Sequence, residues 1–130
     1  MGEADDGADG SDGNLRHVLE AALRENEAAN DNLRNFLVRH RDSSRGVVTR
    51  LISGEHAWSA LENEDAAERR DGYVSALRRF EDSRRELRML VILWAKRYQG
   101  LSYRSIGPRF GVSEQMAAKL GQEASKRYPD

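Results

Sequence analysis

The chain has 130 residues, of which 38% are hydrophobic and 33% charged, with a net charge of -1 and no cysteine. This length suits one domain with a modest core, and the lack of cysteine excludes disulfides and thiolate metal sites. No apolar run approaches the roughly 18 residues that cross a bilayer, and the acidic N-terminus does not resemble a signal peptide. With only two prolines, the composition predicts an all-α protein, which we expect in the cytoplasm and away from membranes.

Residues 1–13 have the sequence MGEADDGADGSDG, which contains five acidic side chains and no basic one. Because this segment has almost nothing apolar to bury, we predict a disordered acidic tail. Its Asp5, Gly7 and Asp9 resemble the start of an EF-hand loop, but Arg16 occupies the position of the bidentate glutamate. The sequence therefore predicts no calcium site here.

A long amphipathic helix is predicted to begin at Asn14, a residue type that caps helices. Residues that recur at alternating steps of four and three indicate a single inward face of this helix. They are Leu15, Leu19, Ala22, Asn26, Ala29, Leu33, Phe36 and His40. In a parallel coiled coil, Asn26 would fix the register of two chains. The same face could equally pack within one chain, with Asn26 near the surface.

The segment DSSRGVVTRLISGEHAWSALENED predicts two short helices. The first ends at Gly54, a residue type that commonly stops helices. Ser53 is the expected cap of the second, in which Trp58 and Leu61 share a face. We therefore expect Trp58 to be a core anchor.

A second long helix is predicted from the acidic pair Glu64-Asp65 to Gln99, with Gly72 as a possible break. Its stretch MLVILWA is apolar on all sides, which predicts burial on all sides. Residues 14–99 are thus interpreted as a bundle with two long helices. Residues 15–40 and 73–98 are a possible homodimer contact.

The charge is unevenly distributed along the chain. Residues 78–130 contain twelve basic and six acidic side chains, a net charge of +6. The overall acidity therefore does not exclude a cationic C-terminal surface that meets phosphate.

Two short helices are predicted after Gly100. Ser102 and Ser113 are expected to cap them, and Gly111 permits the tight turn between them. The expected inward positions are Tyr103, Ile106 and Phe110, then Val112 at the corner, and Met116, Ala117, Leu120 and Ala124. This pattern is typical of a helix-turn-helix. Pro108 removes a backbone hydrogen bond, so the first helix should be short or bent.

The stretch LVILWAKRYQGLSYRSIGPRFGVSEQMAAKL, within residues 90–124, resembles the C-terminal promoter-reading segment (region 4) of sigma factors and related modules of bacterial regulators. The resemblance implies that the helix starting at Ser113 reads base pairs, within a module over residues 89–127. Gly107 stands where that family usually has alanine, and Ala117 where it has valine or isoleucine. Both changes would reduce packing volume where the helices cross.

Side chains suited to DNA accompany this pattern. The predicted base-contacting residues are Ser113, Glu114, Gln115, Ala118, Lys119 and Gln122. The predicted phosphate-contacting residues are Tyr103, Arg104, Arg109, Lys126 and Arg127.

Catalysis finds no support, because the three histidines are scattered and no phosphate-binding loop or nucleophile motif is present. We expect no metal and no cofactor. The leading hypothesis is a sequence-specific double-stranded DNA-binding protein, a small dimeric regulator of a bacterium or phage. The alternative is a protein-interaction adaptor, anti-sigma-like or bound to RNA polymerase or another regulator, whose helix-turn-helix does not read DNA.

Overall fold

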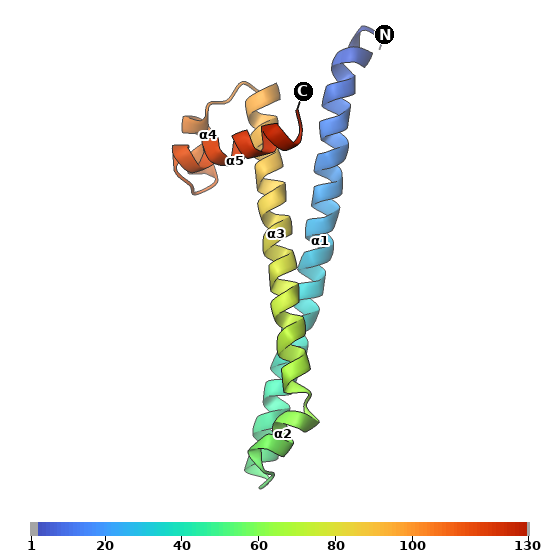
Figure 1. Cartoon of the computed structure of the whole chain (residues 1–130), viewed down its shortest axis with the longest axis vertical. Helices are drawn as coiled ribbons and strands as arrows, with labels where there is room; N and C mark the ends of the chain where they lie inside the picture. The colour runs from blue at the N-terminus through green and yellow to red at the C-terminus, as the bar shows by residue number, and fades with distance from the viewer. Residues whose placement is uncertain (1–2, 130) are drawn as a thin grey trace. The chain divides into compact units, whose positions relative to one another are not determined.

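The computed structural model describes the backbone of residues 3–129 and the side chains of residues 14–129. This part of the chain is all-α, as predicted, and has no β-strand. Its helices are α1 (Glu3–Ile52), α2 (Ala57–Asn63), α3 (Ala66–Tyr98), α4 (Tyr103–Arg109) and α5 (Glu114–Arg127) (Figure 1). None of them has the length and apolar character that crossing a membrane requires.

The chain divides into two compact units. Each unit contains one part of α1 and one part of α3. Unit 1 contains Met1–Glu25 and Arg84–Asp130, and unit 2 contains Asn26–Ser83.

Helix α1 is longer than the sequence suggested. Asn14 lies within it, not at its start, and the segment predicted as a separate short helix continues it to Ile52. Ser43 does not interrupt the helix, because its buried hydroxyl donates a hydrogen bond to the Glu64 carbonyl oxygen (3.3 Å). The helix ends before Gly54, whose φ of 99° confirms the predicted stop. The side chains of residues 1–13 lie outside the described part, so the disordered tail stays a prediction.

In unit 2, α1 and α3 pack against each other through small side chains and close contacts. Asn26 Nδ2 donates to Ser83 Oγ at 3.2 Å, so this residue of the predicted seam is used within the chain. Gly72 does not break α3, contrary to expectation. A Cβ at Gly72 would lie 2.5 Å from Cε1 of Phe36, so the glycine makes room for that ring.

The turn into α3 also differs from the prediction. The helix begins at Ala66 and not at Glu64-Asp65. Asp65 has a φ of 51°, in the left-handed region that Asp tolerates better than most residues, which places it outside the helix.

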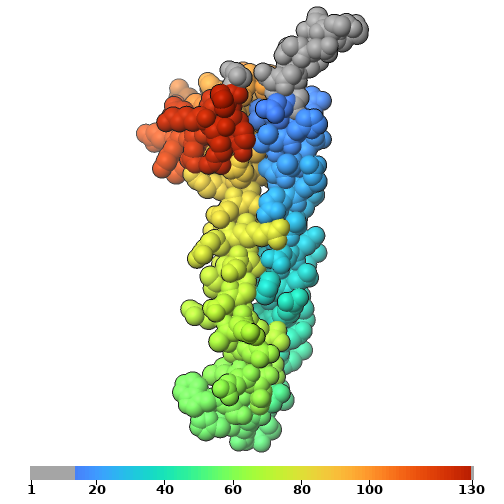
Figure 2. All heavy atoms as spheres, turned by 45° about the vertical axis from the view of Figure 1, so that its right-hand side comes forward, coloured from blue at the N-terminus to red at the C-terminus, as the bar shows by residue number. Residues whose placement is uncertain are grey.

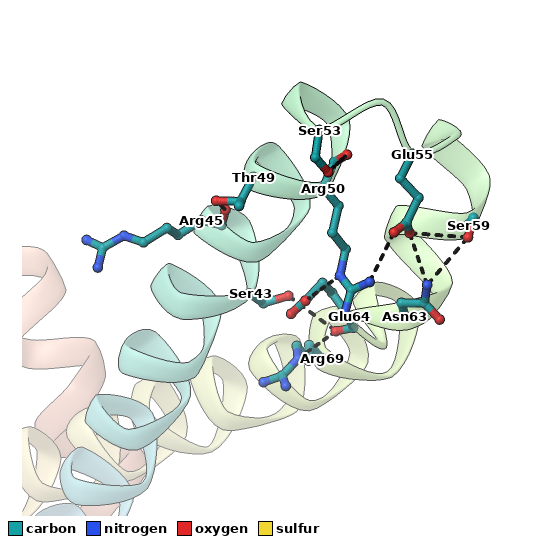
Figure 3. Close-up of polar contacts among 10 residues, drawn as sticks. All are labelled: Ser43, Arg45, Thr49, Arg50, Ser53, Glu55, Ser59, Asn63, Glu64 and Arg69. Atoms are coloured by element: carbon teal, nitrogen blue, oxygen red, sulfur yellow. Dashed lines mark hydrogen bonds and ion pairs between the residues drawn. The ribbon is translucent and has the colours of Figure 1, made fainter.

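A polar network joins α2 to the ends of α1 and α3 (Figure 3). Arg50 donates from Nε to Glu64 (2.9 Å) and from Nη1 to Glu55 (3.1 Å). Burial opposes ionisation of Glu55, but hydrogen bonds from Asn63, Arg50 and Ser59 outweigh it and lower the pKa of the carboxyl. The hydrogen bond to Glu64 is the largest cause of the raised pKa of Arg50. The network thus fixes both ends of α2.

Two predictions about α2 are wrong. His56, not Ser53, caps the helix, because its Nδ1 accepts the N–H of Trp58 at 3.2 Å. Trp58 is no core anchor, since 72% of it is exposed. Ala60 takes the buried position, and a residue two places earlier on a helix lies on nearly the opposite side.

The main core lies in unit 1. Its buried members are Leu15, Met89, Leu90, Ile92, Leu93, Ala95, Ile106, Ala117, Leu120 and Ala124. The predicted burial of residues 89–95 is therefore largely confirmed, although Val91 is 38% exposed. This core seats α4 and α5 against the end of α3.

Candidate nucleic-acid interface

Helix α4 is short, as Pro108 predicts. Ser102 caps it, and its Oγ accepts the N–H of Ser105 at 3.1 Å. The helix has seven residues and ends one residue after Pro108. A proline this close to the C-terminus removes one hydrogen bond and leaves little helix to disturb.

The turn between α4 and α5 depends on two glycines. Gly111 has a φ of 68°, in the left-handed region that favours glycine. A Cβ at Gly107 would lie 2.8 Å from the Val112 carbonyl oxygen and 3.2 Å from that of Ser113. The expectation of lost packing volume at Gly107 is therefore wrong, because the backbone of the turn fills the space that a side chain would need.

Helix α5 starts at the predicted cap. Ser113 Oγ accepts the N–H of Met116 at 3.0 Å. The buried residues of the helix are Ala117, Leu120, Gly121 and Ala124. Gly121 faces the ring of Tyr103, whose Cε1 would lie 2.6 Å from a Cβ on that glycine. The expected inward position is wrong for Met116, which is 42% exposed, and confirmed for the neighbouring Ala117, which is fully buried.

The surface of α5 opposite its buried side carries a row of polar side chains. Gln115, Lys119, Gln122 and Lys126 are all exposed and follow steps of four, three and four residues. Residues at these spacings lie one above another on a helix. We call these four residues the α5 stripe. In unit 1, α5 crosses the end of α3 (Figure 1) and lies at the molecular surface (Figure 2).

The other predicted base-contacting residues flank this stripe. Ser113 and Glu114 are exposed at the start of α5, whereas Ala118 is half-buried. All six predicted residues therefore lie on or next to one helix. The structure brings them together on a single element, with Ala118 the least accessible.

The predicted phosphate-contacting residues are less uniform. Arg104 and Lys126 are exposed, and Arg109 donates to the carbonyl oxygen of Ser105 (2.9 Å) while remaining exposed. Tyr103 is half-buried against Gly121, with Lys96 Nζ 4.9 Å from the centre of its ring. Tyr103 therefore serves mainly as a packing contact.

Arg127 holds α5 in place. It donates to Glu86 of α3 and lies 3.5 Å from Glu123 on its own helix. The charge of Glu86 is the largest cause of the raised pKa of Arg127. A second pair, Arg85 with Glu123 (2.8 Å), also links α3 to α5. Glu86 could not be predicted from the sequence, because no local pattern marks a partner 41 residues away.

Glu86 also accepts a hydrogen bond from the hydroxyl of Tyr128 at 2.7 Å. This bond, with burial, raises the pKa of Tyr128. The neutral hydroxyl thus stabilises unit 1 below the pKa of an unfolded tyrosine, about 10, and this stability is lost as the pH rises.

The substitution Tyr128→Phe should therefore lower the free energy of unfolding by about 1 kcal/mol at neutral pH. Because the wild type loses the contribution of the hydroxyl at alkaline pH, the difference should narrow there. Urea unfolding of both proteins at neutral pH and above pH 10 measures it. A difference that stays constant or widens would contradict this role for the hydroxyl.

Among residues 14–129, no three histidine or acidic side chains gather in a way that could hold a metal ion. Comparison with protein-family models, curated proteins and solved structures finds no match to this chain.

Proposed function

We propose that the chain is a sequence-specific double-stranded DNA-binding protein, a small bacterial or phage regulator without enzymatic activity. In this proposal α4 and α5 form a helix-turn-helix, following a hairpin of two long helices, and α5 enters the major groove. The observation that carries the proposal is the α5 stripe, a row of exposed glutamines and lysines opposite the buried side of the helix.

The side chains of the stripe have the chemistry for reading bases. Glutamine pairs with adenine through two hydrogen bonds, and lysine with guanine or phosphate. Arg104 and Arg109 of α4 supply positive charge next to the turn, while Arg127 is engaged with Glu86. Glu114 repels phosphate, and a cytosine amino group is the base donor that suits it.

Gln115→Ala should weaken binding to the preferred site by about 1–3 kcal/mol and relax specificity at one base pair. Lys119→Ala should also reduce the affinity for DNA. If Lys119 contacts phosphate, the affinity of this variant should fall less steeply with salt concentration than that of the wild type. The site itself comes from selection out of a random duplex pool, and titration at several salt concentrations measures each variant.

Arg34→Ala is the matched control, because it removes an exposed positive charge of α1 in unit 2. This variant should bind like the wild type. If no duplex site is enriched, or if both α5 variants bind normally at moderate salt, direct reading by α5 is wrong.

A protein-interaction adaptor, anti-sigma-like or bound to RNA polymerase, is the second candidate, and the exposed Trp58 favours it. Tryptophan is enriched in protein–protein interfaces relative to the rest of the protein surface. A chain that enriches no DNA site but loses a partner on Trp58→Ala would support this function instead.

A homodimer would present two reading helices to successive major grooves. The predicted dimer contact consists of residues 15–40 and 73–98. Asn26 and Ser83 lie in these ranges, but they form a hydrogen bond with each other within the chain. A dimer through these ranges would have to use exposed apolar side chains such as Leu37 and Val74.

A further inference from the structure

Unit 2 has a thin core, in which no large side chain is fully buried. Its buried side chains, within the described part of the chain, are Ala29, Ser43, Ala60, Ala76 and Ser83, all of them small. Every large apolar side chain of this unit is at least partly exposed, and all the core residues of the main cluster belong to unit 1. Large apolar side chains that stay partly exposed leave apolar surface that a partner can cover.

The uncovered apolar surface of unit 2 forms two adjoining grooves. One, of about 550 Å³, lies along α1 and α3, and Val47, Val48, Tyr73 and Val74 contribute its apolar lining. The other, of about 580 Å³, lies beside Trp58 at the start of α3. Leu61 and Ala66 line both grooves, which places them at the junction.

The two grooves carry opposite charges. The charged residues that line the groove beside Trp58 include Glu62, Asp65 and Glu68. Those that line the groove along α1 and α3 include Arg69 and Arg70. Leu61 and Ala66, which the two grooves share, therefore have the acidic groove on one side and the basic groove on the other. A surface that has an acidic part and a basic part on either side of one point is complementary to a copy of itself turned by 180°.

We propose that unit 2 binds unit 2 of a second copy of this chain through these grooves, with the two-fold axis near Leu61 and Ala66. Glu62 of each copy then faces Arg70 of the other, and the apolar linings cover each other. Two helical hairpins packed this way make a bundle of the usual kind. Arg50, Glu55 and Glu64 hold α2 in place (Figure 3), so the surface to which Leu61 and Glu62 of this helix contribute is formed before association.

Of the predicted inward face through Asn26, only His40 lines either groove. The surface suits a second copy better than an unrelated basic partner, because the acidic groove and the basic groove are both satisfied only by a partner with the same two charges. Cyclic dimers are the commonest oligomers, and their interfaces use one patch on both subunits.

Light scattering and sedimentation of the full chain at micromolar concentrations test the proposal. The wild type should be dimeric. Glu62→Arg and Arg70→Glu should each weaken dimerisation about tenfold, because each puts like charges together twice by symmetry. The double variant Glu62→Arg/Arg70→Glu should restore the dimer, since it exchanges the two charges.

An apolar substitution gives a second measurement. Val48→Asp places a carboxylate in the groove and should make the chain monomeric at these concentrations. Val38→Asp is the matched control, because Val38 is on the same helix with a similar exposure (44% against 53%) but does not line either groove. Circular dichroism checks that each variant keeps its helix content.

A monomeric wild type overturns the proposal, and so does a dimer that Val48→Asp and both charge reversals leave intact. Single reversals that weaken the dimer without rescue by the double variant overturn the pairing of Glu62 with Arg70. A monomer that still enriches a DNA site overturns the dimer and leaves the DNA-binding proposal standing.

Discussion

Gly107→Ala should lower the stability of unit 1 by about 1–3 kcal/mol, near the upper end of that range. The added methyl would lie 2.8 Å from the Val112 carbonyl oxygen, and backbone atoms of a tight turn cannot move aside as a side chain can. Alanine favours a helix over glycine by about 1 kcal/mol, which offsets only part of this cost. Thermal and urea unfolding, followed by circular dichroism, measure the difference.

Gly111→Ala separates this contact from the conformational demand of the turn. A Cβ at Gly111 meets no atom within 4 Å, so the cost there comes from the φ of 68° alone, roughly 1–2 kcal/mol. Gly111→Asn should cost less, because Asn tolerates the left-handed region. If Gly107→Ala is as stable as the wild type, the turn is looser than the structure shows.

The capping residues and turn of the C-terminal segment could be predicted because their causes are local. Ser102 and Ser113 accept backbone N–H groups three residues ahead, and the left-handed φ of Gly111 closes the turn between them. Each of these features depends on residues only a few positions apart. The short α4 followed in the same way from the missing N–H of Pro108.

The longer helices were less predictable because distant residues decide where they end. Gly72 resembles a helix breaker, but Phe36 of the other long helix fills the space beside it. The segment that starts at Asp42 resembles a separate helix, but α1 continues through it, and the hydroxyl of Ser43 bonds to the distant Glu64. Trp58 resembles a core residue, but Ala60 occupies the buried side of a helix of only two turns.

For the candidate site, helix periodicity correctly placed Gln115, Lys119 and Gln122 on the exposed side of α5. It could not show that Arg127 is engaged with Glu86, a residue far away in the sequence. Charge alone therefore overestimates how many arginines are available to phosphate. The exposure of Gln115, Lys119 and Gln122 was the more predictable feature, because it depends on one helix.

The packing of unit 1 leads to the last prediction. Ile106→Ala should lower the free energy of unfolding of unit 1 by about 2–5 kcal/mol. Ile106 belongs to α4, is only 2% exposed and lies in the same core cluster as the buried residues of α5. Ile52→Ala is the matched control. Ile52 is also an isoleucine but is 82% exposed, so its truncation should change the free energy of unfolding by only about 0.5 kcal/mol.

Urea unfolding of both variants, with circular dichroism and tryptophan fluorescence as probes, measures the two effects. Trp94 packs against the core of unit 1 and Trp58 lies in unit 2, so Trp58→Phe leaves Trp94 as a fluorescence probe for unit 1. Equal effects of Ile106→Ala and Ile52→Ala would contradict the core that seats α5. Because that core determines which side chains of α5 face outward, its loss should also abolish DNA binding if α5 reads DNA as proposed.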